Sequence, residues 1–468
     1  MRTARMVAAL AVPLAMAACA GAPAPHRATT RPPSPAVSPG SSTPTQHPAP
    51  AQPATDWITY HGNGARSGAA QHLPAAGRLA MAWSRDLGGA VYGQPLVVGN
   101  TVIAATETDV VYGLDRGTGA VLWHTSVGTP VPLSQQPCGD LDPLGITSTP
   151  VYDPQTRLVY VVAQSGRSRH VLAALAVADG RIAFTRDVPS PDHQPAYDQQ
   201  RGALLAASGS IYVVFGGHFG DCGPYVGSIV AMPATGRGPI SSYQIPTSKQ
   251  AGIWAPGGPV AAPDGTIYVS AGNGAASETR FDGSDSVTAL TPRLKRIGIF
   301  APSDWRTLSA GDLDLGSMTP ALLPDGRILQ VGKSGTGYLL TGARLGGVGG
   351  QVASGQVCAA FGAAAVSGTM AYVPCYGSGL AAVDTAGGKV ALRWRGPASA
   401  WGSPVIGGGA IWVADWQSGV LYELDQATGA VRQQIGMGGE LPHFVSPALS
   451  GDLVLIGTTT GVTAVTGA

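Results

Sequence analysis

Short runs of alternating apolar and polar residues, separated by glycine-rich turns, recur along most of the chain. The two best-preserved copies are residues 89–127 and 401–435. In each copy a Leu-Asp pair ends the third run and a Thr-Gly turn leads into the fourth, at Thr118-Gly119 and Thr428-Gly429. Glycine supplies the positive φ that a tight turn needs, and the preceding Asp accepts hydrogen bonds from its own backbone. Four short strands joined in this way predict one antiparallel blade of a β-propeller.

Less regular copies of the same unit begin near residues 145, 201, 254, 318, 358 and 444, which makes eight units in all. They recur roughly every 42 residues in the C-terminal half and roughly every 53–64 residues in the middle, where the insertions must form loops on one face. The last unit stops at Val465 without a fourth strand, whereas residues 79–87 form a lone strand before the first unit. We therefore expect an all-β, eight-bladed propeller in which this N-terminal strand completes the eighth blade and covers the open edges.

The N-terminus carries a predicted targeting segment. Arg2 and Arg5 precede an apolar run at residues 6–18, which has the length of a signal-peptide core and is too short to span a bilayer. The run ends in Met-Ala-Ala-Cys, which resembles a bacterial lipobox, although Met16 stands where Leu is usual. We expect a signal peptide over residues 1–18 and lipidation of Cys19, with cleavage after Ala17 as the alternative.

Residues 19–55 are rich in Pro, Ser, Thr and Ala and have hardly any bulky apolar side chains. Such a segment cannot offset its ordering entropy by burial, so it is predicted to be an extended, disordered tether. The propeller is predicted to occupy residues 56–468.

Composition narrows the class of partner. Apolar residues make up 44% of the chain, charged residues make up 12%, and the net charge is +1. Nucleic-acid binding depends on clustered Lys and Arg, and no run of five or more charges occurs, so a nucleic-acid partner is not expected.

With Cys19 set aside for lipid, four cysteines remain, and in an oxidising compartment they predict two disulfides. Three pairings are open. Cys358 and Cys375 flank one predicted hairpin, which would bring them within bridging reach. Cys138 and Cys222 then remain, each in a long insertion, and the favoured set is Cys138–Cys222 with Cys358–Cys375. A zinc site is the weaker alternative, because no Cys-x-x-Cys pair occurs and His218 is the only nearby histidine at a plausible spacing.

At these repeats the chain resembles the pyrroloquinoline-quinone (PQQ) repeat propellers, from Trp57 to the C-terminus. That family includes quinoprotein alcohol dehydrogenases and non-catalytic scaffold lipoproteins of outer-membrane assembly. The repeat marks the fold and leaves the function open.

The resemblance implies a set of residues for a quinone site in the central funnel. In the dehydrogenases a Trp stacks under the quinone, an Asn and a Glu bind Ca²⁺, a Lys or Arg contacts the quinone oxygen, and an Asp acts as the base. Trp254, Asn273 and Lys333 match the Trp, Asn and cationic positions. Asp304 is the candidate base, and Asp312 and Asp314 are its rivals.

Other positions depart from the quinone pattern. The segment expected to hold the Glu ligand has His218 and Asp221 instead. No two cysteines are adjacent, and the haem motif Cys-x-x-Cys-His does not occur. The favoured interpretation is that Trp254 and Asn273 both have structural roles. Trp254 would pack within a blade, and Asn273 would lie in a Gly-Asn-Gly turn.

No other catalytic motif is found in the sequence. There is no Gly-x-Ser-x-Gly, His-Glu-x-x-His or phosphate-binding loop. His61, His193 and His443 are isolated and are expected to be structural. Asp282 and Asp285 are a minor Ca²⁺ candidate, with turn capping as the more frequent role of such residues.

The first hypothesis is a non-catalytic binding or scaffold protein outside the cytoplasm, anchored to the cell membrane by lipid on Cys19, or secreted if that cysteine is removed. Its partner would be a protein or a cell-envelope glycan, docked on the face that carries the insertions, and the chain is expected to be a monomer without a cofactor. The alternative is a PQQ- and Ca²⁺-dependent alcohol or sugar dehydrogenase with an altered metal site, using Trp254, Asn273 and Lys333.

Overall fold

The computed structural model describes residues 56–70, 73–275, 279–342 and 344–467. The chain divides into two units, Met1–Ala51 and Gln52–Ala468, and every described residue lies in the second. The predicted signal peptide, the lipidation site at Cys19 and the whole predicted tether lie outside the described residues. Within the described ranges no helix is long and apolar enough to cross a membrane.

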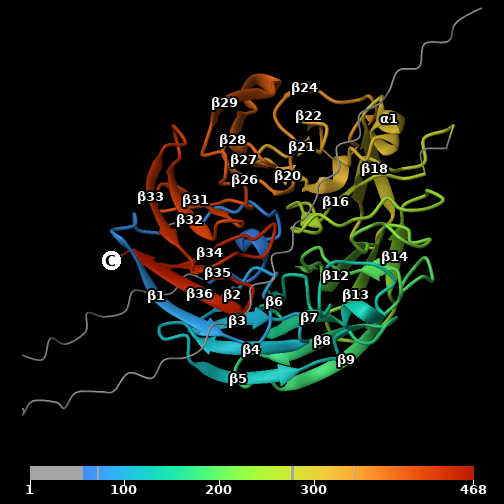
Figure 1. Cartoon of the computed structure of the whole chain (residues 1–468). Helices are drawn as coiled ribbons and strands as arrows, with labels where there is room; N and C mark the ends of the chain where they lie inside the picture. Colours follow the sequence, from blue (N-terminus) through green and yellow to red (C-terminus); the bar gives the residue numbers. More distant parts are fainter. Residues whose placement is uncertain (1–55, 71–72, 276–278, 343, 468) are drawn as a thin grey trace, which may run out of the picture. The chain divides into compact units, whose positions relative to one another are not determined.

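Eight small antiparallel sheets form a ring, so the predicted eight-bladed propeller is confirmed (Figure 1). Blade 1 consists of β2(Leu96–Val98), β3(Thr101–Ala105), β4(Val110–Asp115) and β5(Val121–Ser126), and blade 2 consists of β6(Val151–Asp153), β7(Leu158–Gln164), β8(His170–Ala176) and β9(Ile182–Val188). Blade 3 consists of β11(Leu205–Ala207), β12(Ser210–Gly217), β13(Ser228–Pro233) and β14(Ser241–Gln244), and blade 4 consists of β15(Val260–Ala261), β16(Ile267–Ala271), β17(Ser286–Leu290) and β18(Arg296–Ala301).

Blades 5 to 8 continue the ring with the same four-stranded plan. Blade 5 consists of β20(Ala321–Leu322), β21(Ile328–Val331), β22(Thr336–Leu340) and β24(Ala353–Gln356), and blade 6 consists of β26(Ala365–Ser367), β27(Met370–Cys375), β28(Gly379–Asp384) and β29(Ala391–Arg395). Blade 7 consists of β30(Val405–Gly407), β31(Ala410–Asp415), β32(Val420–Asp425) and β33(Val431–Gly436), and blade 8 consists of β34(Ala448–Ser450), β35(Leu453–Gly457), β36(Gly461–Gly467) and β1(Leu79–Asp86).

Short additional elements lie in the connections. β10(Asp198–Gln199) pairs with β12, β23(Gly347–Val348) pairs with β18, and β19(Met318–Thr319) pairs with β25(Gly362–Ala363). The helical turns are η1(Tyr60–Gly62), η2(Leu133–Gln135), α1(Trp305–Ala310), η3(Leu315–Ser317) and η4(Ala386–Gly388).

The N-terminal strand closes the ring as the sequence predicted. β1 pairs antiparallel with β36, from Leu79 opposite Gly467 to Asp86 opposite Gly461. This pairing joins the two ends of the propeller in blade 8. It also satisfies the backbone groups along one side of β36, which would otherwise be an open edge.

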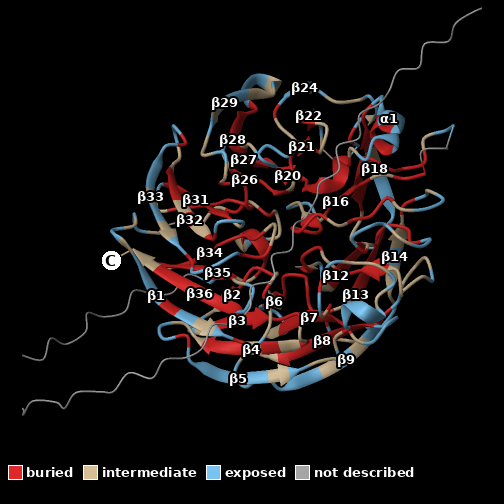
Figure 2. Ribbon diagram, viewed as in Figure 1, coloured by how far each residue is buried: buried red, intermediate tan, exposed pale blue. Residues whose placement is uncertain are grey.

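Burial follows the position of a strand within its blade (Figure 2). The inner strands are buried on both faces, and all six residues of β31 are buried. The outer strand β9 is mostly exposed. Each inner strand has a neighbouring blade on both sides, which explains the continuous apolar runs in the inner strands and the alternation in the outer ones.

The packing of an outer strand on the neighbouring blade explains one of the turn glycines. Trp83, on the outer strand of blade 8, packs on the turn of blade 1, and its indole nitrogen donates to the Arg116 main-chain oxygen at 2.9 Å. A Cβ on Gly119 would lie 2.5 Å from the Trp83 ring, and Gly119 has a φ of 67°. Glycine is therefore required twice at this position, once for the backbone conformation and once for the close approach of the neighbouring blade.

The segment 57–70 crosses the middle of the ring and links blades far apart in the sequence (Figure 1). It hydrogen-bonds through main-chain atoms to the first strands of five blades, at Val97, Tyr152, Ala261, Val366 and Ile406. Arg66 is 2% exposed and donates to the Thr59 hydroxyl and to the main-chain oxygens of Tyr60, Leu204 and Pro259. This N-terminal segment of the propeller therefore ties several blades together at the centre of the ring.

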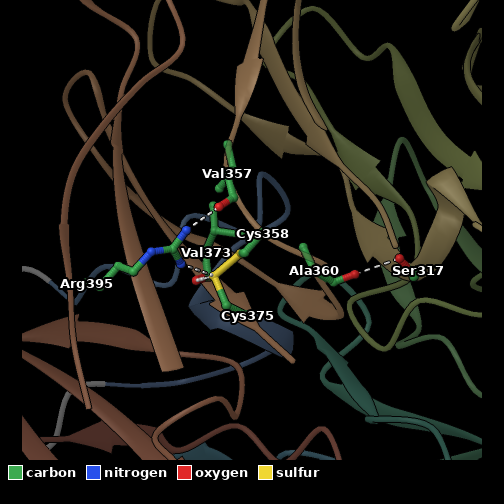
Figure 3. The surroundings of a disulfide bond; sticks show 7 residues. All are labelled: Ser317, Val357, Cys358, Ala360, Val373, Cys375 and Arg395. Carbon is green, nitrogen blue, oxygen red and sulfur yellow. Dashed lines mark hydrogen bonds between the residues drawn. A yellow bond between two sulfur atoms is a disulfide. The ribbon is translucent and has the colours of Figure 1, made fainter. Parts of the chain in front are cut away.

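Both predicted disulfides are present. Cys138 pairs with Cys222 and joins the loop after η2 to the loop between β12 and β13. Cys358 pairs with Cys375 at the end of β27 (Figure 3). In Figure 3 the Arg395 guanidinium lies beside this bridge and donates to the Val357 main-chain oxygen at 2.5 Å. Two disulfides in one chain indicate an oxidising compartment.

The two bridges are expected to differ in their contribution to stability. The double variant C138S/C222S should lower the free energy of unfolding by about 4.5 kcal/mol and C358S/C375S by about 3 kcal/mol, because a crosslink removes more entropy from the unfolded chain when its loop is longer. The sequence separations are 84 and 17 residues. Equilibrium urea unfolding of both variants tests the order, and a larger loss from C358S/C375S would contradict it.

Candidate funnel site

A cavity of about 400 Å³ lies at the funnel face of the propeller. Its lining comes from loops that connect successive blades and from loops between the second and third strands of a blade. The long insertions in the first four blades contribute most of these loops. Phe219 lines the cavity and is 69% exposed, so the cavity opens to solvent. The charged side chains in the lining are Asp140, Arg201, Asp221, Asp312, Asp314 and Lys333.

The structure brings Trp254, Asn273 and Lys333 together in this cavity. Trp254 precedes β15, Asn273 follows β16, and Lys333 follows β21. The Lys333 ammonium lies 5.9 Å from the centroid of the Trp254 ring. These three positions therefore form one site.

The candidate base Asp304 is not among the described residues that line the cavity. It is the residue before α1, whereas its rivals Asp312 and Asp314 follow that helix and line the cavity. The structure therefore brings Asp312 and Asp314 to the funnel cavity and leaves Asp304 on the other side of the short helix α1. Sequence distance from blade 4 could not distinguish the three aspartates.

Lys333 lies between the two aspartates. Its Nζ is 2.8 Å from Asp312 Oδ1 and 2.5 Å from Asp314 Oδ2. The Asn273 side-chain amide donates to Asp312 Oδ1 at 2.7 Å, and its main-chain N–H donates to Asp314 Oδ1 at 2.7 Å. The four residues form a closed network in which Lys333 bridges the two carboxylates and offsets the charge of one of them.

The pKa directions follow from this geometry. Burial raises the pKa of Asp314, and the attraction of Lys333 offsets only part of that effect. Burial alone would lower the pKa of Lys333, but the attraction of Asp314 and Asp312 outweighs it, so the pKa is raised. Lys333 is therefore held as a cation at neutral pH.

The predicted Gly-Asn-Gly turn has a specific role in this network. A Cβ on Gly272 would lie 2.0 Å from Asp314 Oδ1 and 3.3 Å from the Trp254 indole nitrogen. Only glycine lets the Asp314 carboxylate approach the backbone after β16 this closely.

The donor set does not fit the Ca²⁺ that the resemblance implies. Asn273 Oδ1 is buried and has no hydrogen-bond partner among the described residues, as a free metal ligand would. However, both neighbouring carboxylates are occupied by Lys333, and Asp221, near the position expected for the Glu ligand, accepts the Tyr225 hydroxyl at 2.5 Å. Ca²⁺ takes six to eight oxygens, several of them carboxylate, and an ammonium lies where such an ion would have to bind.

The other predicted sites have structural roles. Asp282 accepts the Ser284 hydroxyl at 2.6 Å and caps a turn. Asp285 accepts the Ser309 hydroxyl at 2.6 Å and the Leu315 main-chain N–H at 2.9 Å, so it ties the start of β17 to the α1 segment. Among the described residues no group of three or more His, Cys, Asp or Glu side chains is placed to hold a metal. His61 is buried in the segment that fills the centre of the ring.

Three aromatic rings from different blades form one wall of the cavity. The Trp254 centroid lies 6.2 Å from those of Phe361 and Phe444, and the last two rings lie 5.9 Å apart at an interplanar angle of 12°. His443, treated as isolated in the sequence, lines the same cavity and contacts Phe444 edge-on. Burial, with the nearby Arg201 cation, lowers the pKa of His443 to about 3, so its ring is neutral.

Sequence reasoning missed Arg201, Phe361 and Phe444. Each sits in a loop between blades, where no local pattern marks it. The only signal for Arg201 was a lone cation at the start of the third repeat, in a chain with few charges.

Comparisons with known proteins agree with this fold. A PQQ-repeat family model described as outer membrane protein assembly factor BamB matches residues 75–285. None of the curated proteins matches the sequence.

Among solved structures, the chain is similar to quinohemoprotein alcohol dehydrogenase ADHIIG from Pseudomonas putida HK5, with a TM-score of 0.67, 13% identity, and coverage of 88% of this chain and 80% of that one. It is similar to a europium-containing methanol dehydrogenase, with a TM-score of 0.66, 17% identity and coverage of 87% and 90%. It is also similar to BamB from Moraxella catarrhalis, with a TM-score of 0.56, 15% identity and coverage of 83% and 97%. The ring of eight blades identifies the chain as an eight-bladed β-propeller, and residues 75–285 match the PQQ-repeat family model.

Proposed function

We propose that this chain is a non-catalytic binding protein outside the cytoplasm whose funnel face receives a protein or cell-envelope glycan partner. The carrying observation is the Lys333 ammonium, which lies 2.8 Å from Asp312 and 2.5 Å from Asp314. The two carboxylates that could bind a metal ion are thereby paired with Lys333, while the aromatic wall beside them stays open to the cavity.

The proposed location rests on two features. The disulfides Cys138–Cys222 and Cys358–Cys375 form in oxidising compartments. The lipobox-like sequence ending at Cys19, followed by the Pro-rich segment 19–55, supports a lipid anchor with a tether that holds the propeller away from the membrane.

A PQQ-dependent dehydrogenase is the second candidate, because Trp254, Asn273 and Lys333 do converge in one cavity. The misfit of the donor set to Ca²⁺ argues against it, so no catalytic step is assigned to these residues.

A titration with PQQ and Ca²⁺ separates the two candidates. Adding both to the purified full-length protein is expected to produce no bound-quinone absorbance and no reduction of an electron-accepting dye with alcohols or sugars. A saturable quinone spectrum that disappears in Trp254→Ala, together with dye reduction, would support the dehydrogenase and reject the binding role.

Site-specific photocrosslinking tests the proposed binding face. A photoreactive residue at Phe219, which lines the cavity and is 69% exposed, should capture a defined protein or glycan in the native cell envelope. The same residue at Leu122, which is 55% exposed on the outer strand β5, is the matched control and should not. Equal capture from both positions, or capture only from Leu122, would count against the funnel face.

A further inference from the structure

Arg201 sits at the floor of the funnel cavity, where that cavity meets a smaller one lined by Tyr60, Tyr92 and Pro256. Its guanidinium lies 4.7 Å from the centroid of the Phe444 ring. We propose that Arg201 is the anion subsite of the cavity. It binds a ligand that carries a single carboxylate group and whose flat apolar face lies against the aromatic wall. This inference rests on the proposed function and names the class of ligand for the same site.

The donors of Arg201 are unused. No hydrogen bond or ion pair joins its guanidinium to any described residue, and no Asp or Glu oxygen in the described ranges lies within 4.0 Å of it. Arg66, the other arginine near the centre of the ring, has four oxygen acceptors. A guanidinium presents five donors in a planar fork, so Arg201 is equipped to bind a carboxylate in a bidentate manner.

The second cation in the cavity does not compete for an anion. Lys333 is already neutralised by Asp312 and Asp314. Among the cations of the described lining, Arg201 is therefore the one without a carboxylate at ion-pair distance, and Asp140 and Glu107 act on it only from farther away. Burying such a charge is unfavourable unless a partner arrives, and the contact with Phe444 compensates only part of that cost.

The aromatic wall indicates the shape of the ligand beyond its carboxylate group. Phe444 extends from the Arg201 guanidinium to Phe361 and Trp254, with ring centroids 5.9 Å and 6.2 Å from its own. A ligand whose carboxylate reaches Arg201 can place a flat apolar face against these rings. Aromatic acids have such a face, and so do uronic acid units of glycans.

Two exposed carboxylates in the cavity lining disfavour a ligand with several negative charges. Asp140 and Asp221 come from the two loops that the Cys138–Cys222 bridge joins. Because they repel additional negative charge, a monoanion fits the cavity better than a polycarboxylate.

Isothermal titration with a matched charge series tests this subsite. The probes are 2-naphthoate, the neutral 2-naphthalenemethanol, the cationic 2-naphthylmethylamine and, as the sugar acid, methyl β-D-glucuronide. We expect either carboxylate to bind the full-length protein, and the one that binds identifies the source of the ligand. Its affinity should fall with rising salt and should drop roughly 10- to 100-fold in Arg201→Met.

Two variants serve as controls. Arg201→Lys keeps the charge and should retain part of the affinity, and Arg169→Met removes an exposed arginine paired with Asp187 and should leave binding unchanged. The proposal is overturned if Arg201→Met binds the carboxylate as the parent does, if the amine binds as tightly as the acid, or if neither carboxylate binds. Should Arg201→Met fail to fold, the charge series and the salt dependence of the unaltered protein decide. The quinone titration remains a separate readout, so the non-catalytic role and the anion subsite can fail independently.

Discussion

Replacing Lys333 by methionine is expected to lower the free energy of unfolding by about 3–5 kcal/mol, because removing one partner of a buried ion pair leaves the other charge uncompensated. Lys333 is 19% exposed and Asp314 only 7%. Asp312 is 72% exposed and contributes little to this loss, since water solvates it. Urea unfolding of the two proteins at pH 7 measures the difference.

A double-variant cycle shows whether the loss comes from the Asp314 charge. Lys333→Met with Asp314→Asn should recover much of the stability, because no unpaired charge then remains. Arg169→Met, which breaks a pair whose side chains are 61% and 65% exposed, should change stability by less than about 1 kcal/mol. A loss in Lys333→Met no larger than in Arg169→Met would contradict the role of Lys333 as the internal cation.

The same variant tests whether Lys333 stands in for a metal. Without the ammonium, the Asp312 and Asp314 carboxylates and the unpartnered Asn273 Oδ1 are hard oxygen ligands within one network. Millimolar Ca²⁺ should then raise the unfolding midpoint of Lys333→Met and leave that of the parent protein unchanged. An equal effect on both proteins would mean that Ca²⁺ acts elsewhere.

The Asp109→Asn variant is expected to become more stable than the parent protein as the pH rises. Asp109 is fully buried, and neither of its carboxylate oxygens has a hydrogen-bond partner among the described residues. Burial, together with the nearby Glu107, raises the pKa of Asp109 to about 8. Between the ordinary carboxyl pKa of about 4 and this value, the folded state binds one more proton than the unfolded state, so stability falls as the pH rises.

Asparagine carries no such proton, so the contribution of residue 109 becomes independent of pH. Near pH 4 the two proteins should be similar, and above pH 8 the variant should be more stable by roughly 5–6 kcal/mol, because the pKa rises from about 4 to about 8 and each unit of pKa is about 1.4 kcal/mol. Urea unfolding from pH 5 to 9 provides the curves, with the 65%-exposed Asp187 changed to Asn as the control. Parallel curves for the parent and Asp109→Asn would show that the Asp109 carboxyl is not held neutral.

The architecture was readable from the sequence because each blade is a local unit. Its alternation, its turn glycines and its length lie within one stretch of chain, and eight repetitions leave one strand, β1, to be placed. The eighth unit lacks a fourth strand, so the free edge of β36 is the place left for β1, and in the structure β1 pairs with that edge. The hairpin around Cys358 and Cys375 is equally local, which is why their pairing could be predicted.

The site was predicted only in part, because it is built from loops of different blades. Trp254, Asn273 and Lys333 were found through the family pattern, and they do share a cavity. Asp312 and Asp314 line the cavity and Asp304 does not, because the chain turns through α1 between them, and that path cannot be read from the sequence. Arg201 has no local signature, since what distinguishes it is that no described carboxylate lies at ion-pair distance while its guanidinium lies over Phe444.

The sequence by itself determined that this protein is an eight-bladed propeller closed by its N-terminal strand, with two disulfides and the Trp254, Asn273 and Lys333 set. Those features depend on periodicity, on short-range pairing and on residue identity. Only the tertiary structure decided that Lys333 is engaged by Asp312 and Asp314 while Arg201 is not. The state of a buried charge depends on which distant loops converge around it, and in a propeller that convergence occurs at the axis, far from any local pattern.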